Sequence, residues 1–250
     1  MVTVSQPGQI IALAQRAGAA TLDFFRGDFE VYDKSDDSPL TQADLAADAI
    51  ISAGLPGYPI RSEESSHGDF SASETFWLVD PVDGTRSFVA GSPEYTVNIA
   101  LIHRGRPVWG VIDAPALNQT WWGGPEQGAF FNGDPIRVTA TQSPLRVLAS
   151  RNHLNALTLD FIAALPVHER IQRGSSLKFC AIAMGQADLF PRMGPCCEWD
   201  TGAGEAILMG AGGSICDLAG QPLAYGKADP LNPYFIASGE TNPVDYLPQR

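Results

Sequence analysis

The stretch DPVDGTRSF, residues 80–88, is the most informative part of the sequence, because it places two aspartates three positions apart directly after the apolar run FWLV. That run indicates a buried strand. Pro81 fixes its own φ and disfavours helix at the residue before it, so we expect Asp80 to end the strand and DPVDG to form a tight reversal. In such a reversal the carboxylates of Asp80 and Asp83 and the carbonyl oxygen of Val82 converge on one point. These ligands are all oxygen atoms and suit Mg²⁺ or Mn²⁺.

Gly84 and Thr85 follow the two aspartates. If the chain turns helical there, their free backbone N–H groups form a small anion cradle beside the cations, where a phosphate bridges both. The alternative interpretation is an Asx-Pro turn that only ends a strand. For the complete stretch DPVDGTRSF we favour a metal and phosphate site over such a turn, and we predict metal-assisted phosphate chemistry.

The composition is that of a globular protein, with 44% hydrophobic and 18% charged residues in a chain of 250. This length supports one large domain or two small ones. A net charge of −12 without any basic run argues against a nucleic-acid polymer as partner. The same charge repels a small anionic substrate, so a phosphate ligand must be held by bound metal and a few Lys and Arg side chains.

The N-terminal segment has no basic region, and Gln15, Arg16 and Gly18 interrupt its apolar residues. We therefore expect neither a signal peptide nor a transmembrane segment, and a cytoplasmic location, with peripheral membrane association as the alternative. The four cysteines lack C-x-x-C spacing, so we expect small core residues or inert thiols and no zinc site. A redox-sensitive Cys196-Cys197 pair is the alternative.

Apolar periodicity predicts two helices in the first half, one from Ile10 to about Phe24 and one from about Thr41 to Gly54. Asp44 and Asp48 lie four apart on one face of the second helix, and only one of them needs to face inward. Asn132-Gly133 predicts a two-residue hairpin. Strands are expected at residues 59–61, 76–80, 95–103, 108–114 and 129–131.

The polar stretch TATQSPL, residues 139–145, has no apolar periodicity and is typical of a linker. We therefore expect two domains, residues 1–142 and 143–250. The second half alternates strand and helix, which indicates an α/β layer. Its strands are expected at residues 146–149, 170–172, 188–190, 214–217 and 234–237, and its helices at residues 154–165, 176–185 and 200–210.

Acidic residues at three other places accompany the DPVD motif. Asp44 lies in an early helical turn, Glu63-Glu64 follows a predicted strand, and Asp200 immediately precedes a helix. Each has an ordinary alternative interpretation. Asp44 can be a surface partner of the helix dipole, Glu63-Glu64 a solvated loop and Asp200 an N-cap.

Taken in chain order, Asp44, Glu63-Glu64, DPVDGT and Trp199-Asp200 resemble the signature of the lithium-sensitive, magnesium-dependent phosphomonoesterases. This family includes inositol monophosphatases, fructose 1,6-bisphosphatases and 3'(2'),5'-bisphosphate nucleotidases. The resemblance spans nearly the whole chain, and it points to the bacterial nucleotidases through YTVNIALI (95–102), GSSLKFCAIAMGQADLFPR (174–192) and WDTGAGEA (199–206). It implies an α/β fold with an α+β first half, arranged as a layered αβαβα sandwich with a mainly antiparallel first sheet.

The resemblance also implies the metal ligands. Glu63, Asp80 and the Val82 carbonyl would bind a first Mg²⁺, and Asp80, Asp83 and Asp200 a second. Two or three ions are expected in all, with Mn²⁺ able to substitute and Li⁺ acting as an inhibitor. Two cations would neutralise charge at both ends of an in-line displacement and offset the repulsion among the carboxylates.

The same resemblance implies a catalytic role for Asp44, Glu63 and Thr85. Glu63 and Asp44 would hold the attacking water, the Thr85 hydroxyl would orient it, and no covalent intermediate would form. Enzymes that form a phospho-aspartate use Asp-x-Asp spacing. The spacing here is three with a proline next to Asp80, so this aspartate is better placed as a ligand than as a nucleophile.

Substrate choice rests on the second half of the chain. Arg192 replaces the carboxylate that inositol monophosphatases place at the matching position, and a guanidinium there favours a second phosphate. Lys178 would add charge for the same group, and surface cations are the alternative interpretation of both residues. The full set of expected substrate contacts is Asp83, Gly84, Thr85, Arg86, His153, Gly174, Ser175, Lys178, Arg192 and Asp200.

One position departs from the nucleotidase pattern, because Gly202 replaces the alanine that usually follows Trp-Asp-x. We expect a looser helix start there. The leading hypothesis is a 3'(2'),5'-bisphosphate nucleotidase that hydrolyses adenosine 3',5'-bisphosphate, a small phosphorylated substrate. The alternatives are an inositol-phosphate or fructose 1,6-bisphosphate phosphatase and a non-catalytic ion sensor. The sequence does not indicate an oligomeric state.

Overall fold

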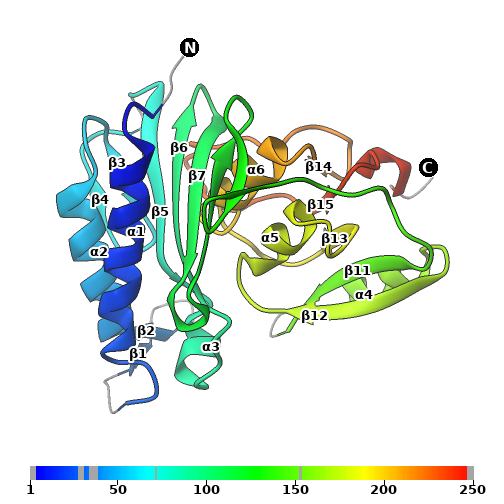
Figure 1. Ribbon diagram of the computed structural model, residues 1–250, viewed down its shortest axis with the longest axis horizontal. Helices are drawn as coiled ribbons and strands as arrows, with labels where there is room; N and C mark the ends of the chain where they lie inside the picture. The colour runs from blue at the N-terminus through cyan, green and yellow to red at the C-terminus, as the bar shows by residue number, and fades with distance from the viewer. Residues whose placement is uncertain (1–3, 28–30, 34–38, 71, 152–153, 247–250) are drawn as a thin grey trace.

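The computed structural model describes residues 4–27, 31–33, 39–70, 72–151 and 154–246. Two β-sheets lie side by side with helices on and between them (Figure 1). Helices α1 (Pro7–Leu22) and α2 (Gln42–Gly54) cover the outer face of the larger sheet. Helices α5 (Leu177–Ala183) and α6 (Gly202–Gly210) fill the space between the sheets, and α4 (Ala156–Ala163) packs on β13 of the smaller sheet. This order of layers is the expected αβαβα sandwich.

The larger sheet has eight strands in the order β10-β9-β8-β7-β6-β5-β3-β4. All neighbouring pairs are antiparallel except β3 and β5, so the first half carries the mainly antiparallel sheet that we expected. Its strands are β3 (Ile60–Ser62), β4 (Ser66–His67), β5 (Thr75–Asp83), β6 (Thr96–His103), β7 (Arg106–Ala114), β8 (Gln119–Gly124), β9 (Gly128–Phe131) and β10 (Asp134–Ile136). A separate antiparallel pair joins β1 (Val31–Asp33) and β2 (Pro39–Thr41).

Strand β5 is apolar along both faces because both faces are covered. Trp77 and Val79 belong to the core under α1 and α2, whereas Phe76 and Leu78 belong to the core between the sheets. This alternation is the two-residue period of a strand. It explains why FWLV reads as a continuous apolar run and not as an alternating one.

The expected reversal at Pro81 is wrong, because β5 continues to Asp83. Its pairing with β6 jumps from Asp80↔Asn98 to Asp83↔Thr96, so β5 carries one residue more than its partner over this interval. This is a β-bulge, a place where a proline is tolerated because it has no N–H to contribute to the ladder. The chain turns only at Gly84, whose φ of 93° is left-handed.

The start of α2 is fixed by a capping box. Thr41 accepts a hydrogen bond from Ala43 N, and the Asp44 carboxylate accepts one from Thr41 N. Only one of Asp44 and Asp48 needed to face inward, but the structure buries both. Asp48 is accommodated inside because Ser62 and Ser65 donate hydrogen bonds to it.

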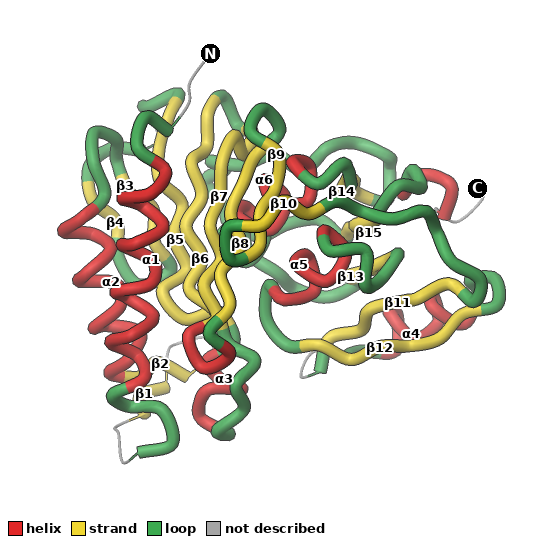
Figure 2. The backbone as a smooth tube through the Cα atoms, viewed as in Figure 1, coloured by secondary structure: helices red, strands yellow, loops and turns green. Residues whose placement is uncertain are grey.

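The smaller sheet has five strands in the order β12-β11-β13-β15-β14. Strand β11 is parallel to both β12 and β13, whereas β15 is antiparallel to β13 and β14. This mixed sheet with its helices confirms the α/β layer (Figure 2). Its strands are β11 (Leu145–Ser150), β12 (His168–Arg173), β13 (Leu189–Arg192), β14 (Ser214–Asp217) and β15 (Phe235–Ser238).

The core between the sheets draws on both halves of the chain. It joins Leu78 and Ile112 of the larger sheet to Phe179 of α5, Ile207 of α6 and Phe235 of β15. Helix α6 approaches β7 so closely that a Cβ on Gly110 would lie 2.7 Å from Ala203 Cα. The lack of a side chain at Gly110 therefore lets the helix seat on the sheet.

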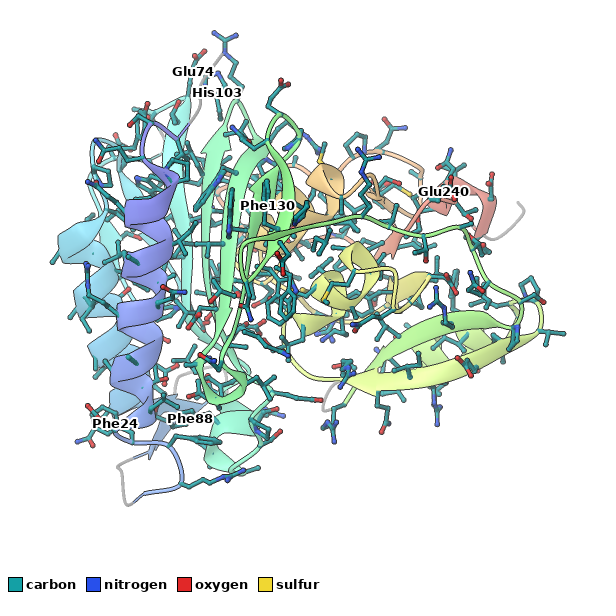
Figure 3. The ribbon with its side chains drawn as sticks, in the orientation of Figure 1. Phe24, Glu74, Phe88, His103, Phe130 and Glu240 are labelled. Atoms are coloured by element: carbon teal, nitrogen blue, oxygen red, sulfur yellow. The ribbon has the colours of Figure 1, made fainter. Side chains whose placement is uncertain are left out.

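Several short elements were not predicted, namely β1, β2, β4 and β8. In β8 the sequence QTWWGG gives no strict alternation, but Trp121 stacks on Phe131 and Trp122 on Phe130 across the β8–β9 pair. Phe130 is labelled in Figure 3. Such aromatic cross-strand pairs stabilise a sheet. In the part of the chain that the structure describes, no helix is long and apolar enough to cross a membrane.

Candidate metal and phosphate site

Three carboxylates converge where the two halves of the chain meet. Asp80 and Asp83 come from the bulged end of β5, and Asp200 comes from the loop before α6. One oxygen from each lies within 4.8 Å of the others. The structure thus brings together three of the predicted ligands, two of which lie more than a hundred residues from the third.

Local backbone geometry explains how the motif presents its oxygens. Val82 N donates a hydrogen bond to Asp80 Oδ1 at 3.1 Å inside the bulge. After left-handed Gly84 the chain forms the short helix α3 (Thr85–Val89), so the helical turn on which the anion cradle depends is present. Phe88 of this helix, labelled in Figure 3, is fully buried against Tyr95 and anchors the turn to the sheet.

The carboxylate of Asp83 is held by donors that the sequence did not reveal. Ser176 donates to Asp83 Oδ2 from its backbone N and from its Oγ, both at 2.6 Å, and Ser175 Oγ donates at 2.8 Å. Asn98 Nδ2 adds a longer bond of 3.4 Å. The available signal was Asn98 itself, a polar residue in the middle of the apolar strand β6. Because these bonds converge on Oδ2, Oδ1 is the oxygen left for a cation.

Asp200 does not cap α6, so the N-cap interpretation is wrong. The N-cap is Thr201, whose side chain makes no capping bond, and the helix begins at Gly202. Asp200 Oδ2 instead accepts a hydrogen bond from Cys197 N at 2.7 Å, and Cys196 also bonds to this carboxylate. The loop therefore turns Asp200 toward Asp80 and Asp83 instead of toward its own helix.

Asp44 and Thr85 form a second part of the site. Thr85 Oγ1 lies 3.2 Å from Asp44 Oδ1 and 3.0 Å from the Val82 carbonyl oxygen. Asp44 is thus tied both to its own helix start and to the turn after the DPVD motif. Glu63, directly after β3, lies near enough to Asp80 and Asp200 for its charge to raise the pKa of both groups.

Burial and mutual repulsion make the cluster electrostatically costly without a cation. Burial raises the pKa of Asp80 well above its usual range, and the charges of Glu63 and Asp83 raise it further. The pKa of Asp200 rises to about 7, chiefly by burial and then by the charge of Asp83. Asp80 Oδ2 is buried with no hydrogen-bond partner. An orphaned buried carboxylate oxygen in a set of oxygen ligands fits Mg²⁺ or Mn²⁺.

Two cations of the second half lie close to each other, and one of them, Lys178, also lies close to the carboxylates. Lys178 is buried, its Nζ donates to Ser175 O at 2.5 Å, and it lies over the Phe190 ring. Burial lowers its pKa to about 8; the charge of Asp83 opposes this shift and that of Arg192 adds to it. Arg192 donates from Nη2 to Pro195 O, and its Nε is buried without a partner. Lys178 and Arg192 are therefore not the ordinary surface cations of the alternative interpretation.

The other expected substrate contacts differ in their surroundings. The N–H of Gly174 is engaged by Glu94 Oε2 at 2.8 Å, and Ser175 has a left-handed φ of 51°. Arg86 is exposed on α3. His153 lies outside the described residues.

A well-formed cavity of the described part of the chain lies away from this site. It has a volume of about 690 Å³ and lies in the second half, lined mostly by apolar side chains such as Phe161, Leu165 and Met193. None of the predicted site residues lines it. We assign the site from its converging oxygens and charges, because metal-assisted chemistry requires those and not an apolar cavity.

The fold and the acidic cluster define a class of protein. Residues 8–242 match the inositol monophosphatase family, and the chain belongs to it. This confirms the family resemblance that the motifs indicated.

Within this family the chain is similar to several bacterial proteins of known name or structure. The chain is 39% identical over 244 residues to the 3'(2'),5'-bisphosphate nucleotidase CysQ of Escherichia coli strain K12, covering 92% of this chain and 98% of that protein. It is 37% identical to CysQ of Buchnera aphidicola, covering 92% and 91%. The crystal structure of CysQ from Bacteroides thetaiotaomicron superposes with a TM-score of 0.85 at 33% identity, covering 95% and 98%. An inositol monophosphatase of Thermotoga maritima gives 0.81 at 27%, covering 95% and 93%.

Proposed function

We propose that this protein is a Mg²⁺-dependent 3'(2'),5'-bisphosphate nucleotidase that converts adenosine 3',5'-bisphosphate to AMP and phosphate. The observation that carries the proposal is the Asp80–Asp83–Asp200 cluster with Lys178 and Arg192 beside it. The carboxylates are suited to cations that hold one phosphate. The two basic side chains are suited to a second phosphate on the same molecule.

Glu63, Asp80 and the Val82 carbonyl would hold one Mg²⁺, and Asp80, Asp83 and Asp200 another. When bound, the metals would supply a Lewis acid that neutralises negative charge on the phosphoryl oxygens and on the leaving oxygen. The hydrogen bonds from Ser175 and Ser176 fix the orientation of Asp83 before any cation arrives. Preorganisation of this kind lowers the reorganisation needed during the reaction.

The chain's own polar groups would position the attacking water. Thr85 Oγ1 donates to Asp44 Oδ1, so its lone pairs remain able to accept a hydrogen bond from water. Asp44, whose Oδ2 is engaged by Thr41, would hold this water together with Glu63. Gly84, Thr85 and Arg86 would line the phosphate undergoing attack.

Specificity would come from the second half. Arg192 and Lys178 would bind the phosphate that is not hydrolysed, with Ser175 beside them and His153 near the base. The unpartnered Nε of Arg192 supports this role, since a buried donor without a partner calls for an acceptor from a ligand. A cytoplasmic location would suit such a small nucleotide substrate.

A panel of phosphate esters tests the substrate. With Mg²⁺ present, kcat/KM for adenosine 3',5'-bisphosphate should exceed that for inositol 1-phosphate and fructose 1,6-bisphosphate. Equal or better turnover of inositol 1-phosphate would refute the specificity. Turnover of no ester would favour the non-catalytic sensor. Li⁺ in the millimolar range or below should inhibit, by the family resemblance.

Asp83→Asn tests the metal assignment. The amide can still accept the bonds from Ser175 and Ser176 but has lost the charge that a cation requires, so Mg²⁺-dependent phosphate release should fall to background. Circular dichroism should show a folded protein. Appreciable residual turnover would count against the role of Asp83.

A further inference from the structure

Outside the acidic cluster, the buried carboxylate of Glu94 lies at the boundary between the two halves of the chain. It precedes β6, and its side chain is only 10% exposed. Arg151 donates to its Oε2 from both Nε and Nη2 at 3.0 Å, and Arg173 Nη1 lies 3.5 Å from its Oε1. Gly174 N completes the set at 2.8 Å. All three partners belong to the second half, although Glu94 belongs to the first.

These partners lie at one edge of the smaller sheet. Arg151 follows β11, Arg173 ends β12, and the register pairs Ser150 with Arg173, so the carboxyl ends of two parallel strands meet at Glu94. Figure 2 shows this end of the two strands directed toward the part of the larger sheet that carries α3. Ligands of α/β sheets bind outside the carboxyl ends of parallel strands. Glu94 therefore organises the edge where a ligand is expected.

Gly174 is required for this contact. A Cβ on it would lie 2.9 Å from the carbonyl oxygen of Glu94 and 3.2 Å from Glu94 Oε2. The backbone of the loop thus approaches Glu94 more closely than any other residue would permit. The next residue, Ser175, has a left-handed φ of 51°, which for a serine must be held by its surroundings.

The loop that Glu94 holds is the one that supports the site. Ser175 and Ser176 donate the short hydrogen bonds to Asp83, and the carbonyl of Ser175 accepts the bond from Lys178 Nζ. A change in this loop would move Asp83's partners and the buried ammonium group together. Within the described residues Glu94 forms no hydrogen bond with Ser175, Ser176 or Lys178, so it acts on them through Arg173 and Gly174 of the loop.

We propose that Glu94 is a positioning residue, which clamps residues 173–176 and keeps Ser175 in the left-handed conformation that presents Ser175, Ser176 and Lys178 to substrate. The proposal rests on the proposed function only for the identity of that substrate. Arg151 and Arg173 are the counterions of Glu94 at this boundary, since a buried carboxylate without partners would be strongly disfavoured.

Glu94→Gln and Gly174→Ala test the clamp. Both should raise KM for adenosine 3',5'-bisphosphate by about tenfold, equivalent to about 1.4 kcal/mol of binding, while kcat falls less than KM rises. Hydrogen–deuterium exchange of the peptide covering residues 173–177 should increase in both variants without substrate. If wild-type protein prefers another phosphate ester, the proposed function fails, and the same variants are compared on that ester.

Asp188→Asn is the matched control. Asp188 is also a buried carboxylate that accepts a backbone N–H and pairs with an arginine, here both from Arg146, but it lies at the opposite end of β13 from Arg192. It should lower the melting temperature and leave KM unchanged. If Glu94→Gln does not fold, Arg151→Gln at the half-exposed Arg151 replaces it, with a KM increase of about threefold expected. The proposal would be overturned if the folded Glu94→Gln and Gly174→Ala variants kept the KM and the hydrogen–deuterium exchange of the wild-type protein. It would also be overturned if Asp188→Asn raised KM as much as they do.

Discussion

At the scale of single residues, the site is a set of charges that the fold holds at a cost. Asp80 is almost wholly buried, lacks a partner for Oδ2 and is raised in pKa by the charges of four other carboxylates. Burial of an unpaired charge is unfavourable, and neighbouring like charges increase the penalty. A bound cation removes both costs, so metal binding should be strongly coupled to stability.

Mg²⁺ should therefore raise the melting temperature of the wild-type protein. At a free concentration of about 100 times the dissociation constant, a single site stabilises by about 2.7 kcal/mol, or roughly 5–10 °C for a chain of this size. Asp80→Asn should abolish this response. The metal-free variant should melt above metal-free wild type near neutral pH, because the repulsion is relieved. Differential scanning fluorimetry with chelator or Mg²⁺ measures both effects, and a full Mg²⁺ response in the variant would contradict the assignment.

The buried carboxyl group of Glu205 should make the free energy of unfolding depend on pH. Burial raises its pKa to about 7, although Arg106 and Tyr225 bond to it. The folded state therefore binds this proton more tightly than the unfolded state, and the stabilisation is lost as pH rises from about 4.5 through 7. Glu205→Gln should flatten the decline in the free energy of unfolding between about pH 5 and pH 8, by at most about 3 kcal/mol.

Urea unfolding at several pH values measures this slope. Some slope should remain, because burial also raises the pKa of Asp113 to about 6. An unchanged slope in Glu205→Gln would show that the residue does not titrate in this range.

At the scale of elements, helix α6 shows how glycines permit close packing. A Cβ on Gly204 would lie 2.4 Å from Cδ2 of the buried Phe179 ring of α5. A Cβ on Gly202 would meet the flexible end of Leu78 at 3.0 Å and Ala100 Cβ at 3.3 Å. Gly202, the unusual glycine after Trp-Asp, thus lies in a tight position against the larger sheet. A small shift of the Leu78 side chain would make room for a Cβ there.

The two glycines should respond differently to alanine. Gly204→Ala should destabilise by about 1–3 kcal/mol, because the ring must move in a packed core. Gly202→Ala should stay within about 1 kcal/mol of wild type, because the gain in helix propensity offsets the contact. Chemical denaturation of both variants decides this, and equal effects would contradict it.

At the scale of the whole molecule, the two halves share one core. Residues before and after the proposed boundary at 142/143 pack together between the sheets, and the carboxylates of the site come from both. A single buried core argues for cooperative unfolding even if the halves are regarded as two domains.

Thermal unfolding should therefore show one transition. Four of the five tryptophans precede residue 143, so their fluorescence reports chiefly on the first half, whereas far-ultraviolet circular dichroism reports on both. The two curves should coincide. Two separated transitions would indicate that the halves are thermodynamically independent.

The chemistry of the site and most of the helices and strands could be predicted from the sequence. The acidic motif at Asp80 and Asp83, the helix that carries Asp44 and the strand–helix alternation after residue 145 follow from short-range preferences of the backbone and from periodicity, which are local properties. Other features became visible only in the folded protein: β5 bulges and continues past Pro81, Asp200 turns away from its helix, and Glu94, Ser176 and Asn98 support the site. These features depend on which buried faces pack together and on where a hydrogen bond can join the two halves of the chain. No local pattern in the sequence encodes either.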